Sequence, residues 1–589
     1  MPFLPVSKSE IKKPLDIILV SGDAYIDHPS FGTALIARYL ESQGYSVGII
    51  AQPDWKSDQD FLELGKPNLF FAVAAGNLDS MVANYTADKK VRRNDMYTPN
   101  NEAGHRPDRA TIVYTNKLKA LFPDVPVVLG GVEASLRRFA HYDYWDDKVR
   151  RSLIFDAKAD FLVYGMAERG IHEIAKIQAT RNKTQTDSKN QIPKNGIPNT
   201  AIIVKDISGY TDALILPSYE EVSADKKKYA EAFKLFYTEG RKKHPRIIIQ
   251  PCQGRYLIVF PPENLSPEEF EALFELPFMR LPHPMYKGLS IPAWDFVRFS
   301  TVSHRGCFGG CSFCAISQHQ GKYITSRSIE SITKEIKEKI IPQPDFKGNI
   351  LDAGGPTSNM YGMECLDKEG CTRASCIYPD ICKKLKVSQK PALKLLQAIR
   401  QLPGVKKVFI GSGVRYDLAL LDEEYMDALV EHHVSGQLSV APEHICEEVL
   451  LMMGKPQFNQ FLKFKDKFEQ LNIKHGKKQF IVPYFIASHP GSTLEHALEL
   501  ALFLKENNIR LEQVQNFTPT PMTISTCMYY TGTDPFTGKA VHVPKGEERS
   551  FQKALLQPHL EKNYRLVAKA LKQLKNMNLL KSLTAYYSE

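Results

Sequence analysis

The sequence predicts an α/β protein in which a doubly wound, Rossmann-like N-terminal domain is followed by a partial (β/α)6 barrel. Two patterns predict this class. Five apolar runs that end at or near glycine occupy the first 165 residues, and six further strand-like runs alternate with helical patterns from residue 296 onward. At 589 residues the chain is also too long for a single hydrophobic core, so we expect several domains.

The N-terminal domain is expected to span residues 1–180. Its predicted strands are 16–22, 45–50, 68–76, 125–131 and 159–165. Apolar residues recur at helical spacing between the first two strands, which predicts a β-α-β unit. Residues 181–200 are polar and contain proline and glycine, so we expect a linker there and a connector region over 181–292 as a whole.

The barrel is expected to span residues 293–545. Its predicted strands are 296–302, 349–355, 406–413, 436–442, 479–486 and 511–517, and its predicted helices are 329–340, 390–401, 422–432, 457–471 and 493–507. Ser328 is a candidate N-cap for the first helix. Because the chemistry of such barrels lies at the carboxyl ends of the strands, we expect the functional site at that edge of the barrel.

A helical extension is expected over residues 546–589. It contains a basic amphipathic helix whose apolar face includes Leu566, Val567 and Leu571. Packing of this face against the barrel is the expected role, and RNA binding is the alternative.

Composition indicates a globular protein of a reducing compartment. The chain has 76 basic and 66 acidic residues, a net charge of +10 that could favour an anionic partner, but the basic runs are short and typical of solvated surface. We expect a cytoplasmic protein with no membrane partner, since no leader-like segment and no run of about 18 apolar residues occurs. Seven of the ten cysteines lie between 307 and 382, which favours metal ligation over disulfides.

Three of these cysteines stand close together in the stretch HRGCFGGCSFC, as Cys307, Cys311 and Cys314. The intervening glycines permit the tight turns that would fold three thiolates around one inorganic centre. Three ligands on a four-iron cluster leave one iron open. Zinc is the alternative, because His304 or His319 could complete a Cys3His tetrahedron.

The stretch CFGGCSFC resembles the signature of the radical S-adenosylmethionine (SAM) superfamily, including the aromatic Phe313 before the last cysteine. The resemblance implies that the three cysteines hold a [4Fe-4S] cluster whose open iron chelates SAM. It implies reductive cleavage of SAM to methionine and a 5′-deoxyadenosyl radical, with flavodoxin or ferredoxin as the electron donor.

Strand-end residues that match the superfamily's SAM contacts are implied as cofactor-binding residues. Gly354 and Gly355 resemble its glycine-rich motif, although Pro356 departs from the usual acidic position. The other implied contacts, which would reach ribose or carboxylate groups, are Ser412, Arg415 and Glu443.

Several longer stretches resemble the YgiQ-like radical SAM family. They are GGVEASLRRFAHYDYWDD (130–147), VYGMAE (163–168), GGPTSNMYG (354–362), YPDIC (378–382) and VQNFTPTP (514–521). That family joins a cobalamin-binding-type Rossmann domain to a radical SAM core and a short C-terminal extension. The resemblance implies the initiating step but neither the substrate nor the product.

Cobalamin binding through a lower histidine requires the motif D-x-H-x-x-G. Here Asp27 and His28 are adjacent and the next glycine is Gly32, so the motif is not matched. We expect His28 to be an ordinary loop histidine. Cobalamin held without that ligand stays an alternative that rests on fold analogy alone.

A second cysteine set lies in an insertion at 359–391, as Cys365, Cys371, Cys376 and Cys382. An apolar-poor loop with four thiols is typical of a metal-stapled segment. The set could hold an auxiliary iron-sulfur cluster or a structural zinc, or the thiols could be unliganded.

The segment LRRFAHYDYW could either clamp an anionic substrate or form an interdomain contact. Its chemistry-bearing residues are Arg137, Arg138, His141, Tyr142, Asp143 and Trp145. For the whole chain we favour a radical SAM enzyme acting on an unidentified substrate, a macromolecule or a small molecule, with methyl or methylthio transfer as one outcome. The alternative function is a non-catalytic iron-sulfur or zinc protein that binds nucleic acid.

Overall fold

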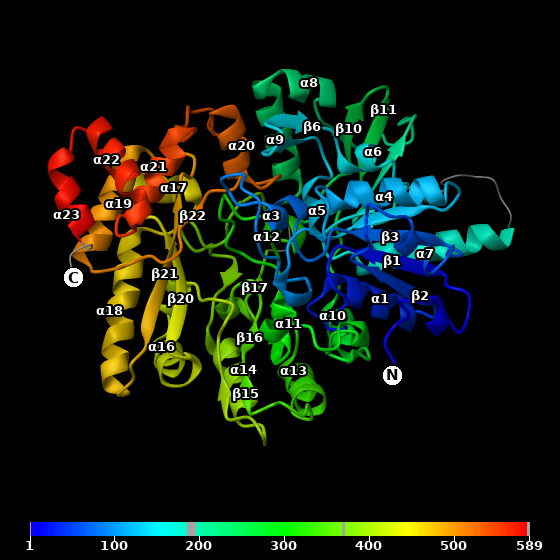
Figure 1. Cartoon of the computed structure of the whole chain (residues 1–589), viewed down its shortest axis with the longest axis horizontal. Helices are drawn as coiled ribbons and strands as arrows, with labels where there is room; N and C mark the ends of the chain where they lie inside the picture. The colour runs from blue at the N-terminus through cyan, green and yellow to red at the C-terminus, as the bar shows by residue number, and fades with distance from the viewer. Residues whose placement is uncertain (1, 185–195, 368–370, 586–589) are drawn as a thin grey trace.

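The structure is a computed structural model that describes residues 2–184, 196–367 and 371–585. Most of the predicted linker therefore lies outside the described residues. An N-terminal half built on one large sheet and a barrel half lie side by side, and the C-terminal helices stand at the far end of the barrel (Figure 1). Among the described residues no helix is both long and apolar enough to cross a membrane.

The N-terminal sheet begins with five parallel strands in the order β2-β1-β3-β4-β7. They are β1 (Ile17–Ser21), β2 (Val47–Ala51), β3 (Phe70–Ala74), β4 (Val127–Gly130) and β7 (Phe161–Val163). Each lies inside or within one residue of a predicted strand. The reversal of strand order beside β1 is typical of a doubly wound sheet, which confirms the predicted fold class of this half.

Both faces of this sheet are covered because its strands are apolar on both sides. Ile17 and Leu19 of β1 pack in the core that contains α1 (Gly32–Ser42) and α7 (Glu168–Thr184). Ile18 and Val20 pack in the core on the opposite face, with α4 (Ala110–Leu121).

Residues 181–292 are not the simple connector that the sequence predicts. Four strands from this region, β8 (Thr200–Val204), β9 (Leu214–Ile215), β10 (Ile248–Cys252) and β11 (Arg255–Val259), extend the same sheet to nine strands in the order β7-β8-β11-β10-β9. The first three junctions in this order are antiparallel. The expected boundary at 180 therefore falls inside the sheet.

Six strand regions form the barrel in chain order. They are β12 (Ser300–Val302), β15 and β16 (Asn349–Ile350 and Asp352–Gly354), β19 (Lys407–Val408), β20 (Gln437–Glu443), β21 (Phe480–Ala487) and β22 (Gln515–Asn516). All paired neighbours are parallel: β12 with β16, β15 with β19, β20 with β21 and β21 with β22. The first strand is shorter than predicted, because residues 296 and 297 belong to helix α11 (Pro292–Val297).

The predicted barrel helices are present. They are α13 (Ile329–Glu335), continued by a π-helical turn to Ile340, α14 (Lys390–Arg400), α16 (Glu423–Ala428), α18 (Phe458–Lys474) and α19 (Leu494–Glu506). Ser328 caps α13, since its side chain accepts a hydrogen bond from the Ser331 amide. Their apolar faces and the strands share one continuous core.

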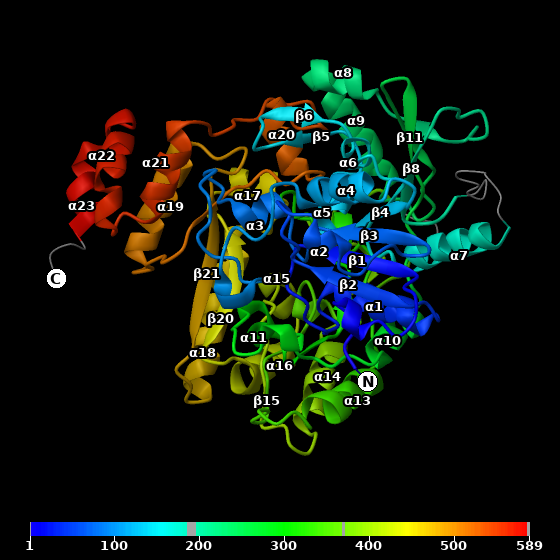
Figure 2. The same cartoon turned by 45° about the vertical axis from the view of Figure 1, so that its right-hand side comes forward.

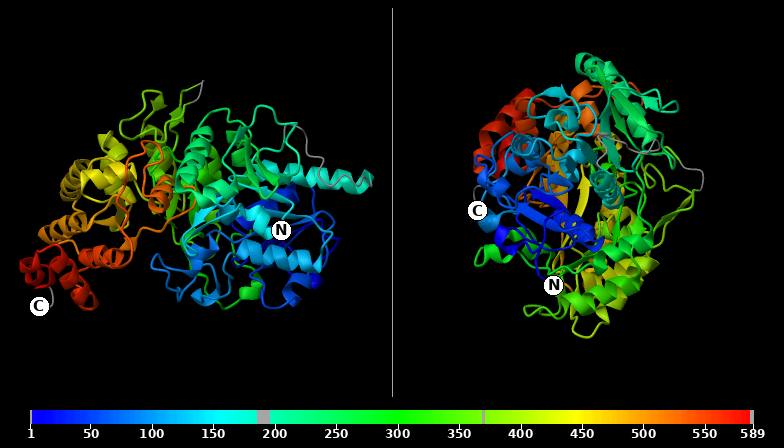
Figure 3. Two further views of the ribbon diagram at one scale, coloured as in Figure 1. Left: turned by 90° about the horizontal axis from the view of Figure 1, so that it is seen from above. Right: turned by 90° about the vertical axis from the view of Figure 1, so that its right-hand side faces the viewer.

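The C-terminal helices pack on the barrel, as expected. They are α21 (Glu547–Leu556), α22 (Tyr564–Gln573) and α23 (Leu580–Thr584). Val567 and Leu571 are fully buried in the barrel core, and Leu566 packs against it. Figure 2 and the left view of Figure 3 show α22 and α23, in red, at the opposite end of the molecule from the N-terminal sheet, in blue.

A buried ion-pair network joins the segment that leads into the barrel to its first helix. Glu335 of α13 lies 2.6 Å from both Arg280 and Arg327 and accepts a hydrogen bond from Thr301 at 2.7 Å. Burial alone would raise the pKa of Glu335, but the two guanidinium groups outweigh burial and hold this pKa below its ordinary value.

Glu335→Gln is expected to destabilise the protein by about 3–5 kcal/mol at pH 7, because it leaves two buried cations without their carboxylate. A lowered folded-state pKa contributes stability above the unfolded value, and that contribution is lost as pH falls through the folded value. The deficit of the variant should therefore shrink below about pH 4. Urea unfolding of both proteins at pH 7, 5, 4 and 3 measures it; a deficit that is the same at all four pH values would contradict this account.

Candidate functional site

The three-cysteine loop follows β12 at the carboxyl edge of the barrel, where barrel enzymes carry their chemistry. It begins after β13 (His304–Arg305) and runs into α12 (Ile316–His319). The Gly309 amide donates to the Cys307 sulfur at 3.3 Å, and the Cys314 amide donates to the Cys311 carbonyl at 3.1 Å. These two hydrogen bonds fold the backbone of the loop around the thiols.

The space between two of the sulfurs is kept open by Gly309. A Cβ at this position would lie 3.2 Å from the Cys307 sulfur and 3.8 Å from that of Cys311. Burial, followed by the neighbouring Cys311, raises the pKa of Cys314 to about 12. Thiols in such surroundings ionise when they bind a cation. The arrangement fits an inorganic centre bound by three thiolates.

The carboxyl ends of the second and third barrel strands are tied together by Asp352. Its carboxylate accepts hydrogen bonds from the Gly411 amide at 2.9 Å and from the Ser412 amide and hydroxyl, both at 3.2 Å. Gly354 lies beside this contact, and a Cβ there would lie 2.0 Å from the Ser412 hydroxyl oxygen. The structure therefore brings Gly354 and Ser412 together, and it explains why this position lacks a side chain.

The next residues along the same two loops also interlock. Asn359 accepts from the Arg415 amide at 2.9 Å and donates to the Arg415 carbonyl at 3.0 Å. The Arg415 guanidinium forms a two-point ion pair with Asp417, at 2.8 and 2.7 Å, and its Nη1 lies 3.7 Å from the Cys311 sulfur. Arg415, whose charge is paired by Asp417, thus places a guanidinium N–H donor beside the Cys311 sulfur.

Arg415→Gln is expected to lower the free energy of unfolding of the cluster-free protein by about 3–5 kcal/mol, because it leaves the buried Asp417 carboxylate unpaired. Urea unfolding measures this loss. In the double variant Arg415→Gln/Asp417→Asn the total loss should be smaller than the sum of the two single losses. A single-variant loss below about 1 kcal/mol would show that the pair is not an important buried ion pair.

Glu443 ends strand β20 and is buried. Its carboxylate lies 3.9 Å from the Lys455 ammonium, and burial raises its pKa above the ordinary value. Its backbone has a φ of +71°, an uncommon conformation that turns the chain at the strand end. Glu443 is also an electrostatic neighbour of Cys314, so the structure places it near the triplet.

Phe313, the aromatic residue of the triplet, is half-buried. Its ring meets His489 edge-on at a centroid distance of 6.1 Å and packs near Ile445 and Ile486. It therefore links the cluster loop to strands β20 and β21.

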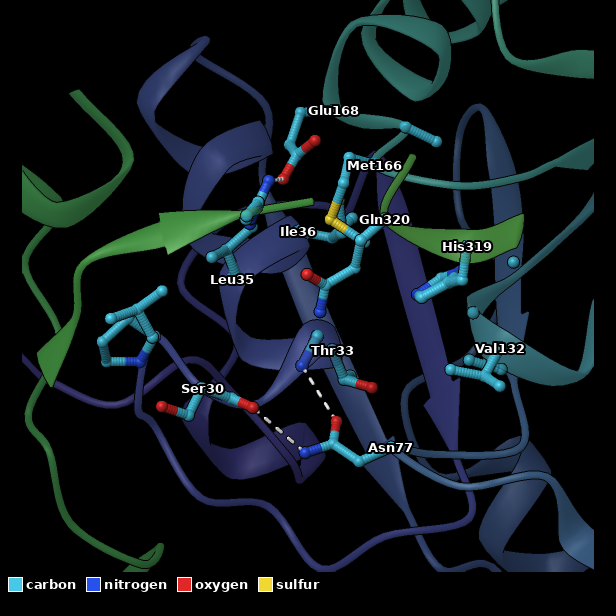
Figure 4. A pocket seen from close by; sticks show the side chains of 18 of the residues that line it. Ser30, Thr33, Leu35, Ile36, Asn77, Val132, Met166, Glu168, His319 and Gln320 are labelled. Carbon is cyan, nitrogen blue, oxygen red and sulfur yellow. Dashed lines mark hydrogen bonds and ion pairs between the residues drawn. The ribbon is translucent and has the colours of Figure 1, made fainter. Parts of the chain in front are cut away.

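A cavity of about 560 Å³ lies where the carboxyl edge of the N-terminal sheet faces the barrel. The N-terminal half contributes Asn77, Gly131 and Met166, and the barrel half contributes Gly354 and Gly355. Figure 4 shows Met166 and Gln320 next to each other in this cavity, with Ser30 and Asn77 on the side of the N-terminal sheet. The same space thus touches the glycine-rich loop and both flanks of the cysteine loop, at His304 and His319.

The two histidines of this cavity are neutral at pH 7. Burial lowers the pKa of His304 and of His319 to about 4. His319 is held by Ser135, whose hydroxyl oxygen lies 3.0 Å from Nδ1, and Arg305 pairs with Glu168 at 2.7 Å. The sequence predicts His304 and His319 only as possible zinc ligands and offers little that singles out Asp352, Asn359 or Ser135. Their one signal is position: Asp352 lies in the predicted strand 349–355, and Asn359 and Ser135 come shortly after predicted strands.

His28 does not line the cavity. It is fully buried, and its Nδ1 accepts a hydrogen bond from the Ser30 amide at 3.1 Å. The adjacent Asp27 pairs with Arg38. His28 is therefore not placed to serve as a lower ligand for cobalamin in this cavity, and the function proposed for this chain does not depend on that cofactor.

The LRRFAHYDYW segment forms contacts between the two halves. Tyr142 stacks on Tyr530 of α20 (Ile524–Thr531) at 4.7 Å, and Tyr144 meets Tyr529 at 5.8 Å. Arg137 pairs with Asp79. The geometry favours a role of this segment in the interdomain contact over a role as a substrate clamp.

Comparisons with known proteins agree with this architecture. The Radical SAM N-terminal family matches residues 3–300, the Radical SAM superfamily matches 301–504, and a domain of unknown function, DUF3362, matches 512–581. A UPF0313 protein of Methanosarcina acetivorans is 48% identical over 98% of this chain and 81% of its own length. A UPF0313 protein of Geobacter sulfurreducens is 49% identical over 97% of this chain and 95% of its own length.

This chain belongs to the UPF0313 family, the YgiQ-like radical SAM proteins. Membership confirms the resemblance drawn from CFGGCSFC and implies a [4Fe-4S] cluster and SAM. It supports an enzyme, whereas the nucleic-acid-binding alternative gains no support from these matches.

Two solved structures resemble the UPF0313 chain at low identity. The radical SAM methyltransferase TsrM from Kitasatospora setae, solved with tryptophan and a SAM analogue, matches with a TM-score of 0.49 and 15% identity, over 86% of this chain and 75% of that one. The cobalamin-dependent SAM radical enzyme OxsB matches with a TM-score of 0.47 and 9% identity, over 96% and 62%.

Proposed function

We propose that this UPF0313 protein cleaves SAM reductively at a [4Fe-4S] cluster on Cys307, Cys311 and Cys314 and abstracts hydrogen from a substrate held in the 560 Å³ cavity. The observation that carries the proposal is the position of this cavity. It is bounded by the glycine-rich loop at Gly354 and Gly355 and by His304 and His319, which flank the cysteine loop. A substrate in this cavity would therefore lie next to the glycine-rich loop and to both ends of the cysteine loop.

The bound cluster and SAM supply the radical chemistry, and the chain supplies ligation, orientation and the exclusion of water. The three thiolates would hold the cluster, and the Arg415 Nη1 would donate a hydrogen bond to the Cys311 sulfur. Ser412, fixed by Asp352, and Glu443 at the end of β20 offer polar groups to SAM from adjacent strand ends. Phe313 is proposed to complete the cofactor-binding set.

The cavity favours a substrate that is largely apolar and carries no net negative charge. Strand and helix residues such as Leu35, Ile36 and Val132 supply apolar walls. The two histidines are uncharged at pH 7, and Arg305 is already neutralised by Glu168. Its volume suits a molecule, or a side group of a larger one, of ordinary drug size.

The test is anaerobic reconstitution with iron and sulfide, followed by low-temperature EPR with and without SAM and an assay for 5′-deoxyadenosine after dithionite reduction. We expect SAM to change the cluster signal and 5′-deoxyadenosine to form. Fractions of a deuterium-labelled cell extract then reveal the substrate, because 5′-deoxyadenosine gains deuterium only when a labelled molecule donates hydrogen.

Zinc in place of iron, or an iron cluster whose EPR signal ignores SAM, would refute the proposal. If 5′-deoxyadenosine forms but no fraction transfers deuterium, the result supports SAM cleavage and contradicts hydrogen abstraction from a cellular substrate.

A further inference from the structure

The four cysteines of the insertion gather in one place, although they are spread over 18 positions of the chain. Cys365 ends β17 (Glu364–Cys365), which pairs with β18 (Leu385–Lys386), and the Cys382 carbonyl accepts from the amide of Leu385 in β18 at 2.9 Å. The Cys382 amide donates to the Cys376 carbonyl at 2.8 Å. Burial, followed by the neighbouring Cys371, Cys365 and Cys376, raises the pKa of Tyr323 to about 12.

A buried cation lies at this cluster of thiols. Lys322 is only 5% exposed, and its ammonium group lies 3.2 Å from the Cys371 sulfur and 2.8 Å from the Arg373 carbonyl oxygen. Neither partner is a carboxylate. A buried ammonium group is costly unless it is paired with negative charge, which ionised cysteines in a metal centre would supply.

The spacing of the sulfurs is wider than one ion requires. Four thiolates around one zinc lie about 3.8 Å apart, because each Zn–S bond is about 2.3 Å long in a tetrahedron. Within the described residues, no three sulfurs of this set lie within 4.8 Å of one another. The same holds for Cys307, Cys311 and Cys314, whose family ligates a four-iron cluster. The second set therefore resembles the triplet in its spacing, and sulfurs that bind different irons of one cluster also stand further apart than those around one ion.

The insertion packs directly on the back of the first cysteine loop. The Cys376 amide donates to the Phe308 carbonyl at 3.0 Å, and Phe308 is the residue after Cys307. A Cβ on Gly310 would lie 2.2 Å from the Ala374 carbonyl oxygen, so the two loops touch along their backbones. Phe308 and Cys376 are each 1% exposed. The two cysteine loops are therefore in direct backbone contact, and the contacting residues Phe308 and Cys376 are shielded from solvent.

The other side of the insertion faces solvent. Leu366 is 56% and Ile381 37% exposed, and the adjacent Lys383 and Lys386 are exposed as well. Two acidic residues, Glu364 and Asp380, are also exposed here, and Asp380 lies 3.5 Å from Arg373. The two lysines, which form no ion pair with another described residue, and the apolar side chains beside them suit an acidic electron-carrier protein, since opposite charge steers association and apolar contact holds the encounter.

We propose that Cys365, Cys371, Cys376 and Cys382 hold a second iron-sulfur cluster that receives electrons from a reduced, acidic one-electron carrier and passes them to the SAM cluster. The inference rests on the proposed function for its final acceptor. One electron leaves the carrier, which is oxidised, and reduces the second cluster; the second cluster is reoxidised when the same electron reduces the first. All four ligand positions are cysteines, so the second cluster has no open iron for SAM.

Iron content and EPR test the metal assignment before any turnover. Reconstituted protein should bind about six to eight irons per chain, two to four more than the SAM cluster needs, and its reduced form should show two signals of which SAM changes one. The variant Cys365→Ser/Cys382→Ser should retain about four irons and the SAM-sensitive signal. Its control, Cys446→Ser, changes a thiol outside both sets and should keep the full iron content. Zinc at the second set, or wild-type protein with about four irons, would overturn the proposal.

The choice of reductant tests the electron route. Dithionite is small enough to reduce the SAM cluster directly, so the double variant should form 5′-deoxyadenosine with dithionite at a rate within about twofold of wild type. With reduced flavodoxin as the sole donor its rate should fall at least tenfold. Equal losses with both donors would assign the insertion a structural role, and no loss with either would remove it from the electron route. If wild type forms no 5′-deoxyadenosine with dithionite, the proposed function fails, while the iron count still decides the second cluster.

Discussion

Cys314→Ala is expected to abolish SAM cleavage, lowering 5′-deoxyadenosine formation with dithionite by more than about 1,000-fold. The first iron site is built from three thiolates, so the loss of one leaves two ligands on a cluster that already has an open iron. The Cys314 side chain is half-buried, with Cys311 and Glu443 as electrostatic neighbours. Iron content, the SAM-sensitive EPR signal and 5′-deoxyadenosine measure the effect together.

Cys446→Ala is the control for this variant, since Cys446 is buried in the same half of the protein and contacts Glu499 at 3.3 Å rather than the triplet. It should keep the SAM-sensitive EPR signal and the cleavage activity. A Cys314→Ala protein that still cleaves SAM at an appreciable rate would remove Cys314 from the ligand set and revive the zinc interpretation of the triplet.

Gly355→Ala is expected to weaken SAM binding at least about tenfold, which corresponds to about 1.4 kcal/mol, while the cluster is retained. An added Cβ would lie 2.6 Å from the His304 ring, which is fully buried and cannot yield. The loop after β16 must therefore move away from the cysteine loop. A SAM titration followed by EPR measures the affinity, and iron content confirms that the cluster is unchanged.

Gly209→Ala is the matched control, because no atom lies within 4 Å of the position of its added Cβ. It should bind SAM as wild type does. If Gly355→Ala also binds SAM normally, the glycine-rich loop does not set the SAM site. Loss of iron in Gly355→Ala would instead show that the loop supports the cluster.

Sequence patterns were most informative where burial enforces a regular period. The five parallel strands of the N-terminal half and all five predicted barrel helices are present, because each packs an apolar face into a large core. The cap at Ser328 was predicted from side-chain chemistry that acts within four residues. By contrast, the strands at 200–259 lie in a region that the sequence predicts as a connector, and their pairing partners are set by the sheet that they join.

The two cysteine sets show the same contrast between features that local sequence determines and features that depend on distant contacts. The triplet could be recognised in the sequence because its ligands lie within one short loop, so local spacing alone brings the thiols together. The second set is more dispersed, and its sequence left cluster, zinc and free thiols open. Its proximity to Phe308 and the burial of Lys322 depend on contacts between segments about 50 to 70 residues apart.

The sequence by itself determined the fold class, the initiating chemistry and the strand ends at which to look for SAM contacts. Only the tertiary structure decided which of those residues meet: Asp352 with Ser412, Asn359 with Arg415, and the carboxyl edge of the N-terminal sheet with the barrel across one cavity. The physical reason is that periodicity and short motifs encode local geometry, whereas these pairs are joined by the packing of distant elements, which no short stretch of sequence contains.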